Sequence, residues 1–160
     1  MRTIEITGKN YSGNWDKSRT ACRGIVMNGT LILLSYETQT GLYMIPGGGM
    51  EDGEDEASCC VRELAEETGL VTEPLACVLE IDEYYEDWKY ISRYFMCEVT
   101  GSCGRKLTER ERSVGMEPRW VPVDEAIEIF SRHGEYAASD EMRRGLYLRE
   151  YNALVNIMRK

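Results

Sequence analysis

Residues 47–70 read GGGMEDGEDEASCCVRELAEETGL, and this stretch decides how the rest of the chain is interpreted. Eight carboxylates fall within residues 51–67, where Arg62 is the only basic residue. Like charges at this density repel one another, so packing alone does not favour such a composition. We therefore expect a cationic ligand at this segment.

The acidic stretch also carries the signals of a helix over about residues 56–68. Asp52 or Asp55 can cap its N-terminus, and Gly69 stands where a C-terminal glycine is common. Apolar or small residues recur at spacings of four, three and four, which predicts a buried stripe of Ala57, Val61, Leu64 and Thr68. Before the helix, three glycines allow a sharp turn and a close approach of the backbone to a ligand, namely Gly47, Gly48 and Gly49.

Three glutamates of this helix are expected to share one side, roughly opposite the apolar stripe. Glu63, Glu66 and Glu67 stand at i, i+3 and i+4, within about 100° of one another around the axis. Left alone they would repel, whereas a hard divalent cation such as Mg²⁺ or Mn²⁺ suits an oxygen-rich cluster. The alternative is an acidic helix face that is merely solvated.

The whole chain, residues 1–160, is expected to form one domain, since 160 residues suffice for a buried core. Its net charge of −9 argues against a nucleic-acid polymer as ligand. No apolar stretch approaches membrane-spanning length and no signal peptide is recognisable, so a cytoplasmic location is expected. The six cysteines show no zinc-type spacing, and buried thiols are the interpretation we favour.

The remaining sequence predicts an α/β fold. Residues 21–36 indicate two strands around an Asn28-Gly29 turn. Further strands are expected at residues 42–46, 75–82, 90–99 and 119–123, with helices over residues 124–133 and from Ser139 onward. This order suggests a mixed β-sheet with helices on both faces.

Residues 48–70 resemble a known signature. Gly48 is followed after five residues by Glu54, and after seven more by Arg62 and the sequence ELAEETGL. This pattern is similar to the box of Nudix (MutT-like) hydrolases at every fixed position. The resemblance implies an α/β/α sandwich with a mixed sheet and a loop-helix-loop catalytic segment.

The resemblance also implies a reaction and a set of residues. The reaction is metal-dependent hydrolysis of a nucleoside diphosphate linked to another group, with Mg²⁺ or Mn²⁺ as cofactor. Glu63, Glu66 and Glu67 would bind metal, and the backbone carbonyl around Gly47 or Gly48 would add a ligand. Arg62 and Glu54 would brace the loop and orient Glu63.

The general base is left open by the sequence. Glu63 could act as base, or a later loop could supply Glu109, Glu111 or Glu117, of which we favour Glu111 both as base and as a further metal ligand. Arg23, together with the backbone of Gly48 and Gly49, could bind substrate phosphate.

Several aromatic residues are candidates for contacts with the substrate. Tyr84, Tyr85 and Trp88 lie in an expected polar turn, where they could stack on a base or cover a core edge. Trp120 is expected in the core. His133 is assigned no role.

Three questions about function stay open at this point. The substrate could be a nucleoside triphosphate, an oxidised nucleotide, ADP-ribose or a nucleotide sugar. An isomerase on the same scaffold would need Cys, His and Glu features that we do not find, whereas a non-catalytic module that binds a nucleotide or a protein is the alternative from another class. A homodimer is plausible.

Overall fold

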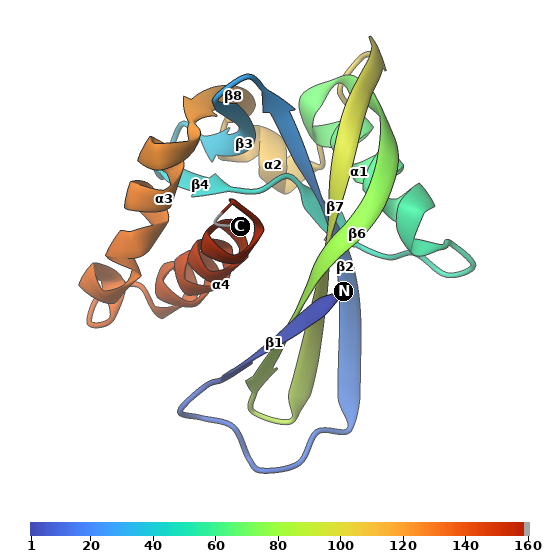
Figure 1. The fold of residues 1–160 in the computed structure, drawn as a ribbon. Coiled ribbons are helices and arrows are strands. Elements are labelled where there is room, and N and C mark those ends of the chain that lie inside the picture. Colours follow the sequence, from blue (N-terminus) through green and yellow to red (C-terminus); the bar gives the residue numbers. More distant parts are fainter. Residues whose placement is uncertain (159–160) are drawn as a thin grey trace.

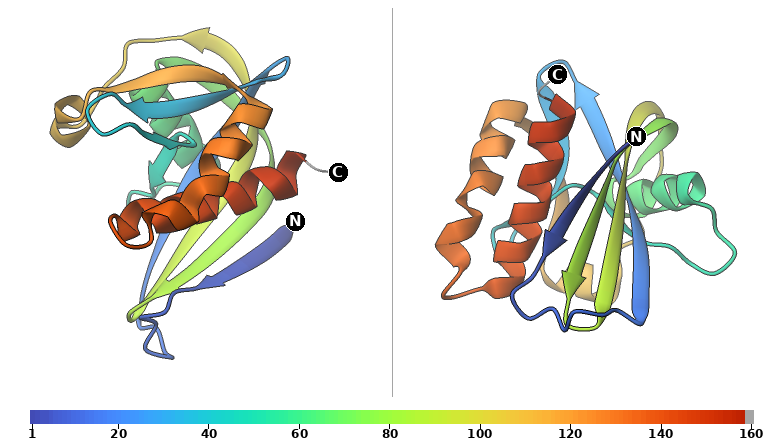
Figure 2. Two further views of the ribbon diagram at one scale, coloured as in Figure 1. Left: turned by 90° about the vertical axis from the view of Figure 1, so that its left-hand side faces the viewer. Right: turned by 60° about the horizontal axis from the view of Figure 1, so that its bottom comes forward.

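The computed structural model describes residues 1–158, which form a mixed eight-stranded sheet between helices. The main strand order is β1-β6-β7-β2-β3-β4, with β5 paired to β2 and β8 paired to β3. Helix α1 covers one face, and α3 and α4 lie together on the other (Figures 1 and 2). The predicted α/β class, with helices on both sides of a mixed sheet, is confirmed.

The elements have the following bounds. The strands are β1 Arg2–Thr7, β2 Lys17–Asn28, β3 Leu31–Glu37, β4 Leu42–Met44, β5 Gly47–Gly49, β6 Leu70–Tyr85, β7 Trp88–Ser102 and β8 Met116–Pro122. The helices are α1 Glu56–Thr68, α2 Glu109–Ser113, α3 Val123–Ser131, the 3-10 helix Arg132–Tyr136 and α4 Glu141–Met158. Among residues 1–158, no helix is long and apolar enough to cross a membrane.

The strands follow the predicted hairpins, with one extension. Gly29 adopts φ +59° in the β2–β3 turn, as the Asn28-Gly29 pair predicts. The strands expected at residues 75–82 and 90–99 are longer and form the β6–β7 ribbon. Tyr84, Tyr85 and Trp88 therefore lie in strands, not in a polar turn. Cross-strand pairing of such aromatic residues favours extended structure.

Helix α1 has the predicted ends but a different buried face. The Asp55 carboxylate accepts from the Ser58 N–H at 2.8 Å, and Gly69 ends the helix at φ +75°. The buried residues are Cys59, Cys60, Leu64, Glu67 and Thr68, whereas Ala57 is exposed and Val61 only half-buried. The predicted stripe is thus wrong at Ala57 and Val61. The helix packs against β5 as well as β2, and the contact with β5 buries Glu67.

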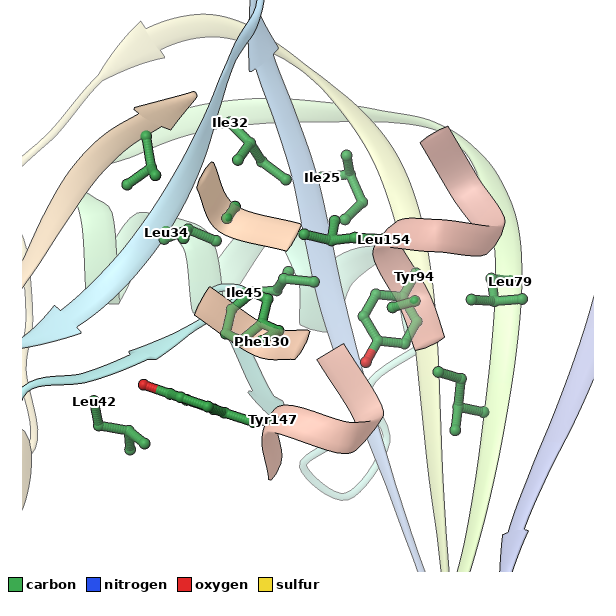
Figure 3. Close-up of a cluster of buried hydrophobic side chains, with 14 residues drawn as sticks. Ile25, Ile32, Leu34, Leu42, Ile45, Leu79, Tyr94, Phe130, Tyr147 and Leu154 are labelled. Atoms are coloured by element: carbon green, nitrogen blue, oxygen red, sulfur yellow. The ribbon is translucent and has the colours of Figure 1, made fainter. Parts of the chain in front are cut away.

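Two apolar clusters lie on opposite faces of the sheet. The larger joins the strands to α3 and α4 and includes Ile25, Tyr94, Phe130, Tyr147 and Leu154 (Figure 3). The smaller lies beneath α1 and contains four cysteines, Cys22, Cys59, Cys60 and Cys97, all buried. The predicted burial of Trp120 is wrong: its side chain is 40% exposed, because Val121, not Trp120, faces the core from β8.

Gly24 of β2 sets how closely α1 approaches the sheet. A Cβ at this position would lie 2.6 Å from both methyl carbons of Leu64, which is itself fully buried. Gly24→Ala is expected to lower the free energy of unfolding by about 1–3 kcal/mol, because the helix must shift to relieve the overlap. Urea denaturation measures this change.

Gly101→Ala is the matched control, since a Cβ on this strand glycine meets no atom closer than 3.8 Å. Equal effects of the two substitutions would contradict the proposed close packing of α1 on Gly24.

Candidate active site

The three glycines of β5 lie between β2 and α1, with no room for side chains. Gly47, Gly48 and Gly49 pair with residues 23, 22 and 21 of β2. A Cβ on Gly47 would collide with the Cys22 carbonyl, and one on Gly48 would lie 2.6 Å from the Glu63 carboxylate. The glycines are therefore required for the close approach of backbone and acid.

Arg62 connects this strand to the acidic residues around it. Its Nε and Nη2 donate to the two Glu54 oxygens at 2.7 and 3.0 Å, and Nη2 also donates to the Gly49 carbonyl at 3.1 Å. Its Nη1 donates to Glu63 at 2.9 Å and to Glu66 at 3.2 Å. The hydrogen bond from Arg62 lowers the pKa of Glu54 to about 2, which keeps this carboxylate ionised.

Glu67 is the most deeply buried acid of the site, with 3% of its surface exposed. Its Oε2 accepts from the Gly47 N–H and from the Ser35 hydroxyl, both at 3.2 Å. Burial, followed by the negative charges of Glu63 and Glu111, raises the pKa of Glu67 to about 8. Burial also raises the pKa of Glu63, against the opposing charge of Arg62. Arg62 gives Glu63 a cationic partner at 2.9 Å, whereas Glu67 has no basic side chain paired with it among residues 1–158, so its ionised form needs a positive charge from a ligand.

The predicted metal ligands do not form a ready-made cage. Within residues 1–158, no three His, Cys, Asp or Glu side chains converge closely enough to hold a metal ion. Glu63 and Glu66 turn to Arg62, whereas Glu67 turns to Gly47. The chemistry of the group nevertheless fits a hard divalent cation, because buried carboxylates with raised pKa values and a nearby backbone carbonyl are oxygen ligands. Metal binding by these residues stays a prediction.

Of the three loop acids considered, Glu111 is the one whose charge reaches the site. It raises the pKa of Glu63 and of Glu67. Glu111 also accepts from the Thr108 N–H at 2.9 Å in a capping box at the start of α2. Glu117 pairs instead with Arg119 at 2.8 Å, and Glu109 is exposed. The capping-box spacing of Thr108 and Glu111 was a sequence signal for this helix.

A cavity of about 430 Å³ adjoins the glycine strand on the face that α4 covers. Its walls come from β2, β6, β7 and α4, and include Arg19, Arg23, Tyr85, Tyr90, Met142 and Arg149. Arg23 pairs with Gly47 in the sheet, and a Cβ on Gly49 would lie 2.5 Å from the Arg19 guanidinium. The cavity therefore lies on one side of the Gly47–Gly49 backbone, and the acids of α1 contact this backbone from the other side.

Sequence reasoning singled out Arg23 but missed Arg19, Tyr90 and Arg149. Arg149 lies on α4, with Nε 3.1 Å from Glu150 and Nη1 3.6 Å from Glu83. The helix also carries Glu141, Arg143 and Arg144, so the adjacent Arg149-Glu150 pair does not stand out in its sequence. Their distant partners could not be identified without the fold.

A model of the NUDIX domain matches residues 17–142. The chain belongs to the Nudix family. It is a Nudix hydrolase, and the predicted family and enzyme class are confirmed at this level. Nudix hydrolases generally use divalent metal cations, and pyrophosphate hydrolysis is their common reaction.

Curated relatives and a solved structure agree with this assignment. Diphosphoinositol polyphosphate phosphohydrolase 3-alpha of Mus musculus is 28% identical over 127 residues, covering 78% of this chain and 76% of the relative. An RNA pyrophosphohydrolase of Dinoroseobacter shibae is 37% identical over 104 residues, covering 64% of this chain and 60% of the relative. The NUDIX hydrolase of Nitrosomonas europaea has the same fold, with a TM-score of 0.59 at 21% identity over 86% of this Nudix chain and 90% of its own.

The raised pKa of Glu67 predicts that the stability of the metal-free Nudix domain depends on pH. The folded state binds a proton that the unfolded state loses above its ordinary value of 4.5, so stability falls between pH 4.5 and about 8. Glu67→Gln should remove this decline and raise the unfolding free energy at pH 8 by about 1–3 kcal/mol. Urea titrations in a chelating buffer at several pH values measure it.

Glu66→Gln removes a more exposed carboxylate from the same helix and is the matched control. A Glu67→Gln protein that is less stable than the parent at about pH 8 would count against the assignment. So would a Glu66→Gln protein that loses the pH dependence of stability to the same extent as Glu67→Gln.

Proposed function

We propose that this protein is a divalent-metal-dependent hydrolase that cleaves the pyrophosphate linkage of a nucleoside diphosphate joined to another group. The observation that carries the proposal is the burial of Glu67 beside Gly47, Glu63 and Glu111, with no basic side chain paired to it in the described part of the chain. A Mg²⁺ or Mn²⁺ ion bound there would neutralise substrate phosphates and activate a water.

The residues of the chain would divide the work as follows. Glu67, Glu63, Glu66 and the backbone carbonyl of Gly47 or Gly48 would hold the ion, with Glu111 available as a further ligand. Arg62 would release Glu66 more readily than Glu54, because it holds Glu54 through two hydrogen bonds and Glu66 through one. Glu111, whose negative charge acts on Glu67, would take the proton of the attacking water, and Glu63, which lies against Gly48, is the alternative base.

The cavity beside the glycine strand supports a nucleotide as substrate. Tyr85, Tyr90 and Met142 provide apolar and aromatic wall for a base, and the buried Tyr85 hydroxyl has no hydrogen-bond partner among the described residues. Arg19 and Arg23 form no ion pair within residues 1–158 and adjoin Gly49 and Gly47, where a diphosphate would lie.

The charge of the cavity disfavours a densely phosphorylated ring, although several relatives are named for diphosphoinositol polyphosphate. Arg149 is neutralised by Glu83 and Glu150, and Glu141 is paired with Arg144. Two arginines are left, which match a diphosphate better than many phosphates. A cytoplasmic location and a homodimer stay predictions from the sequence.

Phosphate release is the direct test of the reaction. Nucleoside triphosphates, oxidised nucleotides, ADP-ribose, nucleotide sugars, dinucleoside polyphosphates and a diphosphoinositol polyphosphate would each be incubated with Mg²⁺ or Mn²⁺, with pyrophosphatase or alkaline phosphatase to reveal the product. We expect one nucleotide to be cleaved fastest, and Glu67→Gln to lower kcat by about 10³-fold or more, since it removes a transition-state contact.

A fold-intact wild type that binds a nucleotide but cleaves none with either metal would favour the non-catalytic binding module. Preferred cleavage of the inositol compound would contradict the nucleotide assignment while leaving the hydrolase assignment standing.

Arg23 is predicted to bind substrate phosphate. Arg23→Met should raise KM about tenfold or more with a smaller change in kcat, because it removes a charged contact at the edge of the cavity. Arg132→Met is the matched control, since Arg132 pairs with Glu128 on the surface, 58% exposed. Steady-state kinetics on the fastest substrate decide; an unchanged KM for Arg23→Met would refute the role.

A further inference from the structure

Helix α4 covers the outer strand β4 and accepts hydrogen bonds from one backbone donor of this strand and from the residue that follows it. The Tyr43 N–H donates to the Tyr147 hydroxyl at 3.1 Å, and the Ile45 N–H donates to Glu150 Oε2 at 2.7 Å. Tyr147 and Glu150 are three residues apart, so they lie one above the other on the helix. An edge strand that would otherwise offer free N–H groups is closed in this way.

Glu150 is an unusual residue for this task, because it is charged and fully buried. Besides the Ile45 amide, its carboxylate accepts from the Tyr94 hydroxyl at 2.6 Å and from Arg149 Nε at 3.1 Å. Burial alone would raise the pKa of Glu150, but Arg149 and its other partners lower it, so the group is ionised at neutral pH. A buried ion pair is weak evidence for a role in stability, since apolar residues often serve equally well.

Ile45, whose N–H Glu150 binds, lies two residues before the glycine strand. Pro46 follows Ile45, and its carbonyl accepts from the Gly24 N–H at 3.0 Å. The next N–H, that of Gly47, donates to Glu67 at 3.2 Å. Over three residues the backbone is thus attached to α4, to β2 and to α1. The ring of Pro46 limits the backbone between these attachments, so a shift at Ile45 is transmitted to Gly47.

We propose that Glu150 is a positioning residue of the active site, which fixes the Gly47–Gly49 backbone against Glu67 through the Ile45 amide. This role, which rests on the proposed function, also ties the site to the cavity, because Arg149 lines the cavity wall and binds the same carboxylate. Two carboxylates from opposite faces of the sheet, Glu67 and Glu150, hold the same short segment.

Two conservative variants separate the effect of the side-chain length of Glu150 from that of its negative charge. Glu150→Gln loses the charge but keeps an oxygen that can accept from Ile45. Glu150→Asp keeps the charge but is one methylene too short. We expect Glu150→Gln to keep kcat within about threefold and Glu150→Asp to lower it about tenfold or more, with KM changed less, because displacements of about 1 Å are costly in catalysis.

Tyr147→Phe is the matched control, since it removes the hydrogen bond from the Tyr43 N–H to α4, two residues farther from the glycines than Ile45. It should leave kcat near that of the parent while lowering stability. A kcat for Glu150→Asp equal to or above that for Glu150→Gln would overturn the proposal, as would an equal loss in Tyr147→Phe. Circular dichroism verifies the fold of each variant.

Amide hydrogen exchange followed by NMR supplies a measurement that does not depend on turnover. The exchange of the Ile45 amide should be about tenfold faster in Glu150→Asp and nearly unchanged in Glu150→Gln. Unchanged exchange at Ile45 in Glu150→Asp would also overturn the positioning role. A wild type that cleaves no substrate would instead contradict the proposed function. The exchange rates would then test only whether Glu150 holds the Ile45 amide.

Discussion

The site depends on the close contact between the glycine strand and helix α1. Gly48 meets the Glu63 carboxylate, the Gly47 N–H donates to Glu67, and the Gly49 carbonyl accepts from Arg62. A Cβ on Gly47 would overlap the Cys22 carbonyl, and one on Gly48 would push the Glu63 carboxylate aside. The absence of Cβ atoms over three residues therefore allows a backbone and a set of carboxylates to occupy one small volume.

The carboxylates that suit this site to binding a cation also destabilise the fold. Arg62 is a single cation that serves Glu54, Glu63 and Glu66, and Glu67 is left in the buried interior without it. Burial therefore raises the pKa of Glu67, which in an ordinary core would be a defect. Functional sites commonly retain such costs because a ligand relieves them.

The sheet separates an acidic region from a region with arginines and a cavity, and the substrate must contact both. The acids lie toward α1, whereas Arg19, Arg23 and the cavity lie toward α4. The glycine strand is the boundary between them, since its residues contact both groups. Glu150 matters in this setting because it reaches the same boundary from the α4 side.

Local features that depend on neighbouring residues could be predicted from the sequence. The cap at Asp55, the left-handed Gly69, the turn at Gly29 and the spacing of the box acids all follow from short-range geometry. Which faces are buried depends on contacts between distant segments and could not be predicted in the same way. Ala57 and Trp120 turned out exposed and Glu67 buried, because the position of β5 and the outward side of β8 depend on residues distant in sequence. The cavity and the link from Glu150 to Ile45 join segments about a hundred residues apart, and periodicity within one segment carries no information about such pairs.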